Sequence, residues 1–194
     1  AENPLIITAD TGREPEAMKY LATLTERFAL PVIPAFPRYL NLPSDHPMLL
    51  DYAVGPHIKA ADVVLVLDSD VPWIPAKDGS PANAKVIHMG TDPLYSGYPM
   101  RGYPCDIAIA APSSISLPAL SAAMERSYAV HKTGIAARRA RIDEARQIVR
   151  ARWQQIEEGM ETATPIHPAW LSRCVGDLMD DNAILINERG VALP

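Results

Sequence analysis

The stretch AADVVLVLDSD, residues 60–70, decides the fold class. Its centre, residues 62–67, is an almost continuous run of valine and leucine that has the length of a buried strand and no alternation of apolar and polar side chains. Strands of this kind usually belong to parallel sheets that are covered on both faces. Four other runs share these properties, at residues 5–8, 32–35, 85–89 and 106–110. We therefore expect five strands of one sheet.

The connection between the first two strands indicates how the sheet is covered. Residues 14–29 place Met18, Leu21, Leu24 and Phe28 at helical spacing, which predicts one β-α-β crossover. Prolines crowd residues 31–56 and 72–104, where long helices are hard to build, so ordered loops should dominate there. The predicted fold is α/β: a Rossmann-like three-layer sandwich with a mostly parallel sheet.

The second half of the chain is dominated by helical patterns. Residues 116–128 predict a helix with Ser116 as its N-cap, and a longer one follows Thr133 and ends at Gly159. Residues 161–165 suit a linker, 168–179 predict a helix and 183–187 one more strand. We predict a central domain over residues 1–130, a helical linker over 131–165, and an orphan helix-strand unit, the truncated start of another domain, over 166–194.

Composition narrows the function classes. Hydrophobic residues make up 48% of the chain and charged residues 21%, and the longest apolar run is far too short for a membrane span. The net charge of −5 argues against nucleic acid or an anionic membrane as a partner. Cys105 and Cys174 lie far apart and near no histidine of metal spacing, which suggests neither a disulfide framework nor a metal site and fits a reducing cytoplasm.

Basic residues concentrate on the long predicted helix. Seven of the 18 lysines and arginines lie there: Lys132, Arg138, Arg139, Arg141, Arg146, Arg150 and Arg152. Such a stripe could bind a polyanion, but acidic residues offset it and no aromatic side chains interleave with it. We favour a solvated linker helix.

Four aspartates follow the predicted strands at the edge where open α/β sheets hold ligands. For Asp10 and Asp92 we favour caps and turns, whereas Asp68 and Asp70 suit a ligand cleft and a structural turn equally well. Trp73 beside them could form a binding wall or cover the core. Neither His46 nor His88 has an adjacent nucleophile, so both are expected to be structural.

The order of several motifs resembles the central domain of acetolactate-synthase-like enzymes that use thiamine diphosphate. They are Leu30-Pro31-Val32, Asp45-His46-Pro47, residues 60–67, and residues 85–88 leading to Asp92-Pro93. The tail, from Ile166-His167-Pro168 to Gly190, resembles the opening of the family's cofactor-diphosphate domain. The resemblance implies an α/β domain of the six-stranded class. It also implies that a turn at Asn187, Glu188 and Gly190 faces the cofactor.

The resemblance also implies what the longer enzyme would do. Thiamine diphosphate and magnesium would serve decarboxylation of a 2-keto acid and transfer of its acyl unit, with the other domains of the chain, and a homo-oligomer, as partners. The present chain would be catalytically incomplete, because the family's catalytic glutamate and magnesium ligands have no counterpart in it. It would therefore bind neither cofactor by itself.

The sequence departs from the members of the family that bind FAD. It has Ala9-Asp10-Thr11-Gly12-Arg13 where those members have a glycine-rich turn, and the carboxylates of Asp68 and Asp70 would repel a phosphate. FAD is not expected. The alternative to the enzyme-domain hypothesis is a free-standing Rossmann-like module that binds a nucleotide or CoA.

Overall fold

The computed structural model describes residues 1–180 and 182–185. The chain divides into two compact units, Ala1–Arg146 and Gln147–Pro194. The division falls inside the predicted linker, and the first unit contains the whole sheet.

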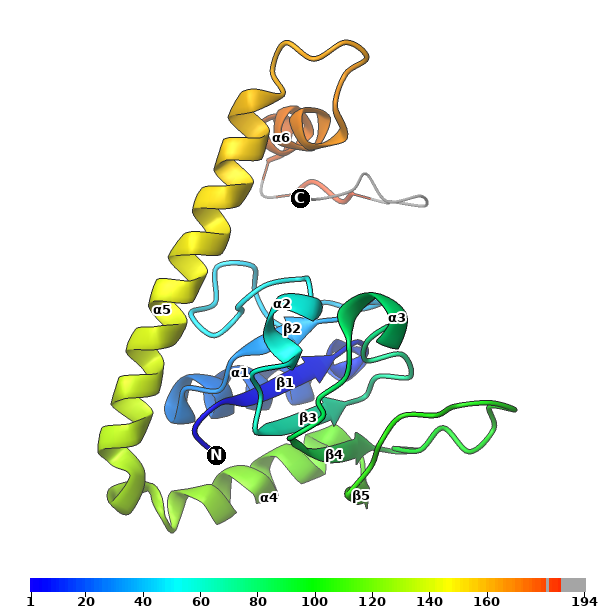
Figure 1. Ribbon diagram of the computed structural model, residues 1–194, viewed down its shortest axis with the longest axis vertical. Helices are drawn as coiled ribbons and strands as arrows, with labels where there is room; N and C mark the ends of the chain where they lie inside the picture. The colour runs from blue at the N-terminus through cyan, green and yellow to red at the C-terminus, as the bar shows by residue number, and fades with distance from the viewer. Residues whose placement is uncertain (181, 186–194) are drawn as a thin grey trace. The chain divides into compact units, whose positions relative to one another are not determined.

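The sheet confirms the predicted fold class. Its strands are β1 (Pro4–Thr8), β2 (Val32–Pro34), β3 (Val63–Leu67), β4 (Lys85–Gly90) and β5 (Ile107–Ala110). All neighbours pair in parallel, in the order β2-β1-β3-β4-β5 (Figure 1). Among the described residues the sheet has five strands rather than six, because the chain after β5 continues into helices.

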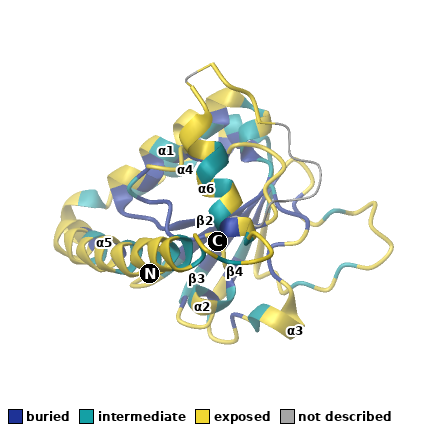
Figure 2. Ribbon diagram, turned by 90° about the horizontal axis from the view of Figure 1, so that it is seen from above, coloured by how far each residue is buried: buried dark blue, intermediate teal, exposed yellow. Residues whose placement is uncertain are grey.

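Helices and loops pack against both faces of the sheet, although the edge strand β5 stays largely exposed. Alternate side chains of the strands enter two cores, with Ile6, Leu65 and Met89 on one face and Ile7, Val64 and Val66 on the other. The first face packs against α1 (Pro15–Phe28), α4 (Ser113–Glu125) and the beginning of α5 (Tyr128–Gly159). The second packs against α2 (Gly55–Ile58) and the loop before α3 (Pro75–Asp78). Figure 2 shows the buried residues concentrated in the strands and in the helix faces that meet them.

The beginning of α4 corrects one predicted cap. Pro112, not Ser116, is the N-cap residue, and the helix begins at Ser113 and ends at Glu125. Ser116 is buried within the first turn. The next helix, α5, begins at Tyr128, earlier than predicted, and ends at Gly159 as predicted.

The second unit contains the end of α5 and helix α6 (Pro168–Leu178). The imidazole of His167 caps α6, with its Nδ1 accepting a hydrogen bond from the Ala169 amide at 3.2 Å. The strand predicted over 183–187 is absent from residues 183–185. The Ala183 amide instead donates a hydrogen bond to the Asp180 carbonyl. Residues 186 and 187 lie outside the described residues. A strand needs neighbouring backbone partners, and local apolarity alone does not supply them.

Within residues 1–180 and 182–185, no helix combines the length and the apolar character needed to cross a membrane. The longest of the described helices, α5, carries charged side chains from Lys132 to Glu158.

Candidate functional site

The carboxyl edge of the sheet brings together the aspartates that the sequence singled out. Asp10 follows β1, Asp68 follows β3, and Asp92 follows β4. All three line one small cavity of about 230 Å³, together with Arg13, Gly90 and Tyr95 among others. Parallel strands place their carboxyl ends at one edge, which is why residues so far apart in sequence meet there.

Arg38 joins two of these carboxylates. Its guanidinium donates to Asp10 through Nε (2.9 Å) and Nη2, and to Asp70 through Nη1 (3.0 Å) and Nη2 (3.1 Å). The carboxylates are largely buried, with side chains 14% and 11% exposed, whereas that of Arg38 is 49% exposed. Hydrogen bonds to Asp10 and Asp70 raise the pKa of Arg38, so the guanidinium remains charged. The result is a fixed clamp between the loops that follow β1, β2 and β3.

The electrostatics of Asp70 follow from this clamp. Burial by itself would raise the pKa of the Asp70 carboxyl, but hydrogen bonds from Arg38 and from the Tyr98 hydroxyl (2.8 Å) outweigh it, and the pKa lies below its usual value. The Val71 amide adds a further bond at 2.9 Å. Asp70 is therefore an ionised anchor whose acceptor sites are occupied by protein donors.

Asp68 occupies a strained and buried position. Its φ of 46° is left-handed, which is uncommon for a residue other than glycine. Its carboxylate accepts hydrogen bonds from the hydroxyls of Ser113 and Thr11. Burial raises the pKa of Asp68, although these two bonds oppose the rise. Gly90 on the neighbouring strand lies so close that a Cβ there would come 2.7 Å from Asp68 Oδ1.

The loop between β4 and β5 folds over the edge and is fastened there. Arg101 donates to the carbonyls of Asp70 (3.1 Å) and Ser69 (3.3 Å). Its guanidinium also lies over the rings of Tyr95 and Tyr103, 5.0 Å from each centroid.

His88 belongs to the same structural network. It is fully buried, and burial lowers its pKa. Nε2 lies 3.0 Å from the Pro104 carbonyl and Nδ1 lies 3.3 Å from Arg101, an arrangement that suits a neutral ring donating from Nε2. As expected from the sequence, His88 has a structural role.

The turn after β1 does not fit a phosphate. The Gly12 amide donates to Asn41 Oδ1 at 3.3 Å, and Asn41 in turn donates to the carbonyls of Ala9 and Tyr39. A Cβ on Gly12 would lie 1.7 Å from the Leu40 carbonyl oxygen, so backbone already fills the space above the turn. In dinucleotide-binding folds that space and those amides receive the pyrophosphate.

Three other predicted residues have structural positions. Asp92 closes a turn by accepting from the amide (2.9 Å) and hydroxyl (3.0 Å) of Ser96, as favoured from the sequence. Trp73 is completely buried in the core and stacks edge to face on Tyr103, so it covers the core and is no binding wall. His46 is buried and its Nδ1 accepts from the Met48 amide.

Sequence reasoning missed the side chains that organise this edge: Arg38, Asn41, Tyr98, Arg101 and Ser113. Arg38 could have been found, because it is the only lysine or arginine in the proline-rich stretch 31–56. The candidate cofactor residues Asn187, Glu188 and Gly190 lie outside the described residues.

The chemistry open to this edge is limited. Its carboxylates accept hydrogen bonds from protein donors, and its cavity of about 230 Å³ is smaller than the roughly 300–1,000 Å³ that ligand sites usually occupy. In the part of the chain that the structure describes, no cluster of three or more histidine, cysteine or acidic side chains could hold a metal ion. The contacts that the structure shows at this edge, above all those of Arg38 with Asp10 and Asp70, join loops to one another.

Comparison with known proteins identifies the fold. No protein-family model and no curated protein matches this sequence. Among solved structures, a protein of Mycobacterium smegmatis proposed to be a thiamin diphosphate-dependent enzyme matches with a TM-score of 0.52 at 20% identity. The match covers 63% of this chain and 25% of that one, so the chain spans only part of the length of its structural relative. The α/β sandwich described above is thus similar in fold to a portion of that larger protein.

Proposed function

We propose that this chain is the central scaffold domain of a thiamine-diphosphate-dependent enzyme that acts on 2-keto acids, by acetolactate-synthase-like decarboxylation and carboligation. The observation that carries the proposal is the match of a single α/β domain to about a quarter of a much longer chain. The order of the motifs at residues 30–32, 45–47, 60–67 and 85–93 supports it independently.

The geometry of the carboxyl edge supports a scaffold role for this domain. Asp10, Arg38 and Asp70 fasten three loops, and the turn at Gly12 is closed by Asn41 and the Leu40 carbonyl. These features favour a rigid spacer over a nucleotide-binding or CoA-binding module, and they disfavour FAD in this domain. Thiamine diphosphate and its divalent metal, bound on other domains, would supply the chemistry.

Asn187, Glu188 and Gly190 would contribute to the cofactor-binding turn of the next domain. The other domains of the chain would pack around this one, and we propose a homo-oligomer for the whole enzyme.

The decisive experiment uses the complete gene product. Purified protein would be stripped of cofactors by gel filtration with a chelator and then assayed for carbon dioxide release from pyruvate and from larger 2-keto acids. Activity should return only when thiamine diphosphate and magnesium are added together, and the 194-residue chain should remain inactive under the same conditions. A gene product of this length alone, or a longer one that binds no thiamine diphosphate by calorimetry, would refute the proposal. Micromolar binding of ATP or CoA to the 194-residue chain would favour the free-standing module instead.

A further inference from the structure

One part of the sheet is left without a complete cover. The cross-strand row Ile6, Leu65, Ile87 and Ile107 runs from β1 to the edge strand β5. Its exposure rises along that path, from 2% at Ile6 to 8% at Leu65 and 50% at Ile107. The apolar face therefore emerges from under the helices toward β5.

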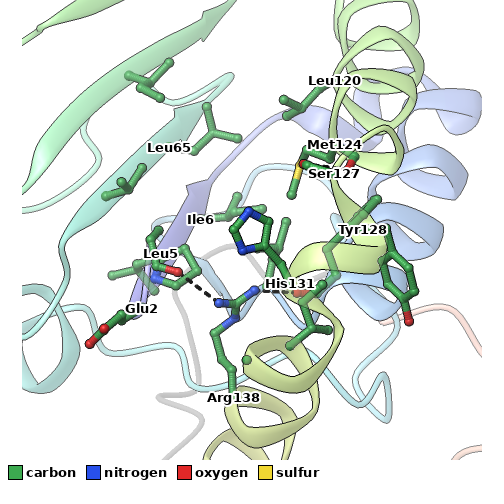
Figure 3. A pocket seen from close by; sticks show the side chains of 18 of the residues that line it. Glu2, Leu5, Ile6, Leu65, Leu120, Met124, Ser127, Tyr128, His131 and Arg138 are labelled. Atoms are coloured by element: carbon green, nitrogen blue, oxygen red, sulfur yellow. Dashed lines mark hydrogen bonds between the residues drawn. The ribbon is translucent and has the colours of Figure 1, made fainter.

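A cleft of about 670 Å³ lies over this face, within the first unit of the chain (Figure 3). The sheet contributes Leu65, Ile87 and Ile109 to its wall, and α4 contributes Leu120 and Met124. This volume falls inside the range of about 300–1,000 Å³ that is typical of sites for small molecules. An apolar pocket of this size that also carries a few polar groups is a candidate binding site.

The α5 wall of the cleft has an unusual residue. Gly134 lies inside the helix, where glycine is less favourable than alanine. A Cβ placed on it would meet no atom within 4 Å, so close packing does not require the glycine. Because Gly134 lines the cleft, we expect a larger side chain at this position to narrow it.

The rim of the cleft is basic. Arg138 donates to the carbonyls of Ala29 (2.7 Å), Phe28 (2.8 Å) and Ala1 (3.1 Å), and thereby caps the carboxyl end of α1. Arg141, one turn further along α5, donates to the Glu2 carbonyl (3.1 Å) and to Asn3 Oδ1 (3.4 Å).

Within the described part of the chain neither guanidinium forms an ion pair. Burial and the neighbouring Arg141 lower the pKa of Arg138, and the negative charge of Asp62 opposes this shift without cancelling it. His131 also lines the rim, and the one carboxylate there is that of Glu2.

We propose that this cleft binds an amphipathic carboxylate, with the aliphatic chain against the sheet face and the carboxylate at the Arg138 and Arg141 end. Apolar walls with a few charged groups at one end are the usual chemistry of such sites. The cleft is separate from the carboxyl-edge cluster, and none of its lining residues takes part in the Arg38 clamp. The inference does not depend on the proposed function.

Calorimetry with sodium decanoate, kept below its micelle-forming concentration, tests the proposal on the 194-residue chain. We expect saturable binding with one site in the micromolar range. Decanol, which lacks the charge, should bind more weakly, and decyltrimethylammonium should not bind. Decanol binding as tightly as decanoate would overturn the assignment of the carboxylate, and no saturable decanoate binding would overturn the whole proposal.

Variants place the ligand in the cleft. Gly134→Leu should fill the mouth and abolish binding, whereas Gly134→Ala, which shares the gain in helix propensity, should retain it; both should melt at a higher temperature than the wild type. Arg141→Gln should weaken the binding of decanoate about fivefold, which is the upper limit for an exposed ion pair. The affinity for decanol should not change. Glu2→Gln should strengthen decanoate binding. Unchanged decanoate affinity in Gly134→Leu, with the raised melting temperature showing that it is folded, would place the ligand elsewhere and refute the proposal.

Discussion

Replacing Arg38 with glutamine tests the interpretation of the carboxyl edge as a fastening. The substitution removes four hydrogen bonds between a guanidinium and two carboxylates that are 14% and 11% exposed. Removing one partner of a fully buried ion pair costs about 3–5 kcal/mol, and losing an exposed pair costs at most about 1 kcal/mol. Because the Arg38 side chain is 49% exposed, we discount the first figure for solvent screening and expect a loss of about 2 kcal/mol at pH 7.

The pH dependence gives this prediction a second test. Hydrogen bonds from Arg38 and Tyr98 keep the pKa of Asp70 below its ordinary value, despite burial. The ionised Asp70 therefore stabilises the folded state fully at pH values above the pKa of an aspartate in the unfolded chain, which is about 4. This stabilisation is lost as the pH falls from there through the lower folded pKa. The difference in the free energy of unfolding between wild type and Arg38→Gln should therefore be constant from pH 7 to about pH 5 and should shrink below about pH 4.

Urea denaturation at pH 7, 5, 4 and 3 measures this difference directly. Arg126→Gln is the matched control, because Arg126 is exposed at the end of α4, and its substitution should change the free energy of unfolding by less than about 0.5 kcal/mol. Equal free energies of unfolding for Arg38→Gln and this control at pH 7 would refute the fastening role of Arg38. A full difference between wild type and Arg38→Gln at pH 3 would refute it as well.

Three further predictions follow from the fold and the sequence. Gly12→Ala should destabilise the chain by about 1–3 kcal/mol, because the added Cβ would overlap the Leu40 carbonyl. Gly97→Ala is the control, because a Cβ at Gly97 would meet open space. Equal urea midpoints for the two variants would contradict the packing at Gly12. A chain ending at Thr164 should still unfold cooperatively, since the sheet and both its cores lie in the first unit; a broad transition without cooperativity would make the tail integral to the domain. The 194-residue chain should be colourless and should bind neither thiamine diphosphate nor magnesium at micromolar concentration, an affinity that requires about 8 kcal/mol; flavin absorbance or a calorimetric signal would refute this.

The sequence alone was enough to predict the sheet and its class. The four strands β1 to β4 carry their own evidence, because a parallel strand buried on both faces must be apolar at nearly every position, as residues 63–67 are. The edge strand β5 has an apolar sequence too, but it is largely exposed. The crossover helix at Pro15–Phe28 was equally predictable, since its inward face recurs with the period of the helix. The positions of the aspartates at the carboxyl edge follow from the strands themselves.

Only the tertiary structure decided what those aspartates do. Whether Asp70 faces a ligand or an internal partner depends on Arg38 and Tyr98, which come from loops 32 and 28 residues away in sequence. Such loops have no periodicity, so a sequence pattern cannot place their side chains. The closure of the turn at Gly12 by Leu40 and the incomplete cover over β5 are likewise results of packing between distant segments. Local patterns specify elements because backbone periodicity is a local property, whereas clamps and clefts form only where separate elements meet.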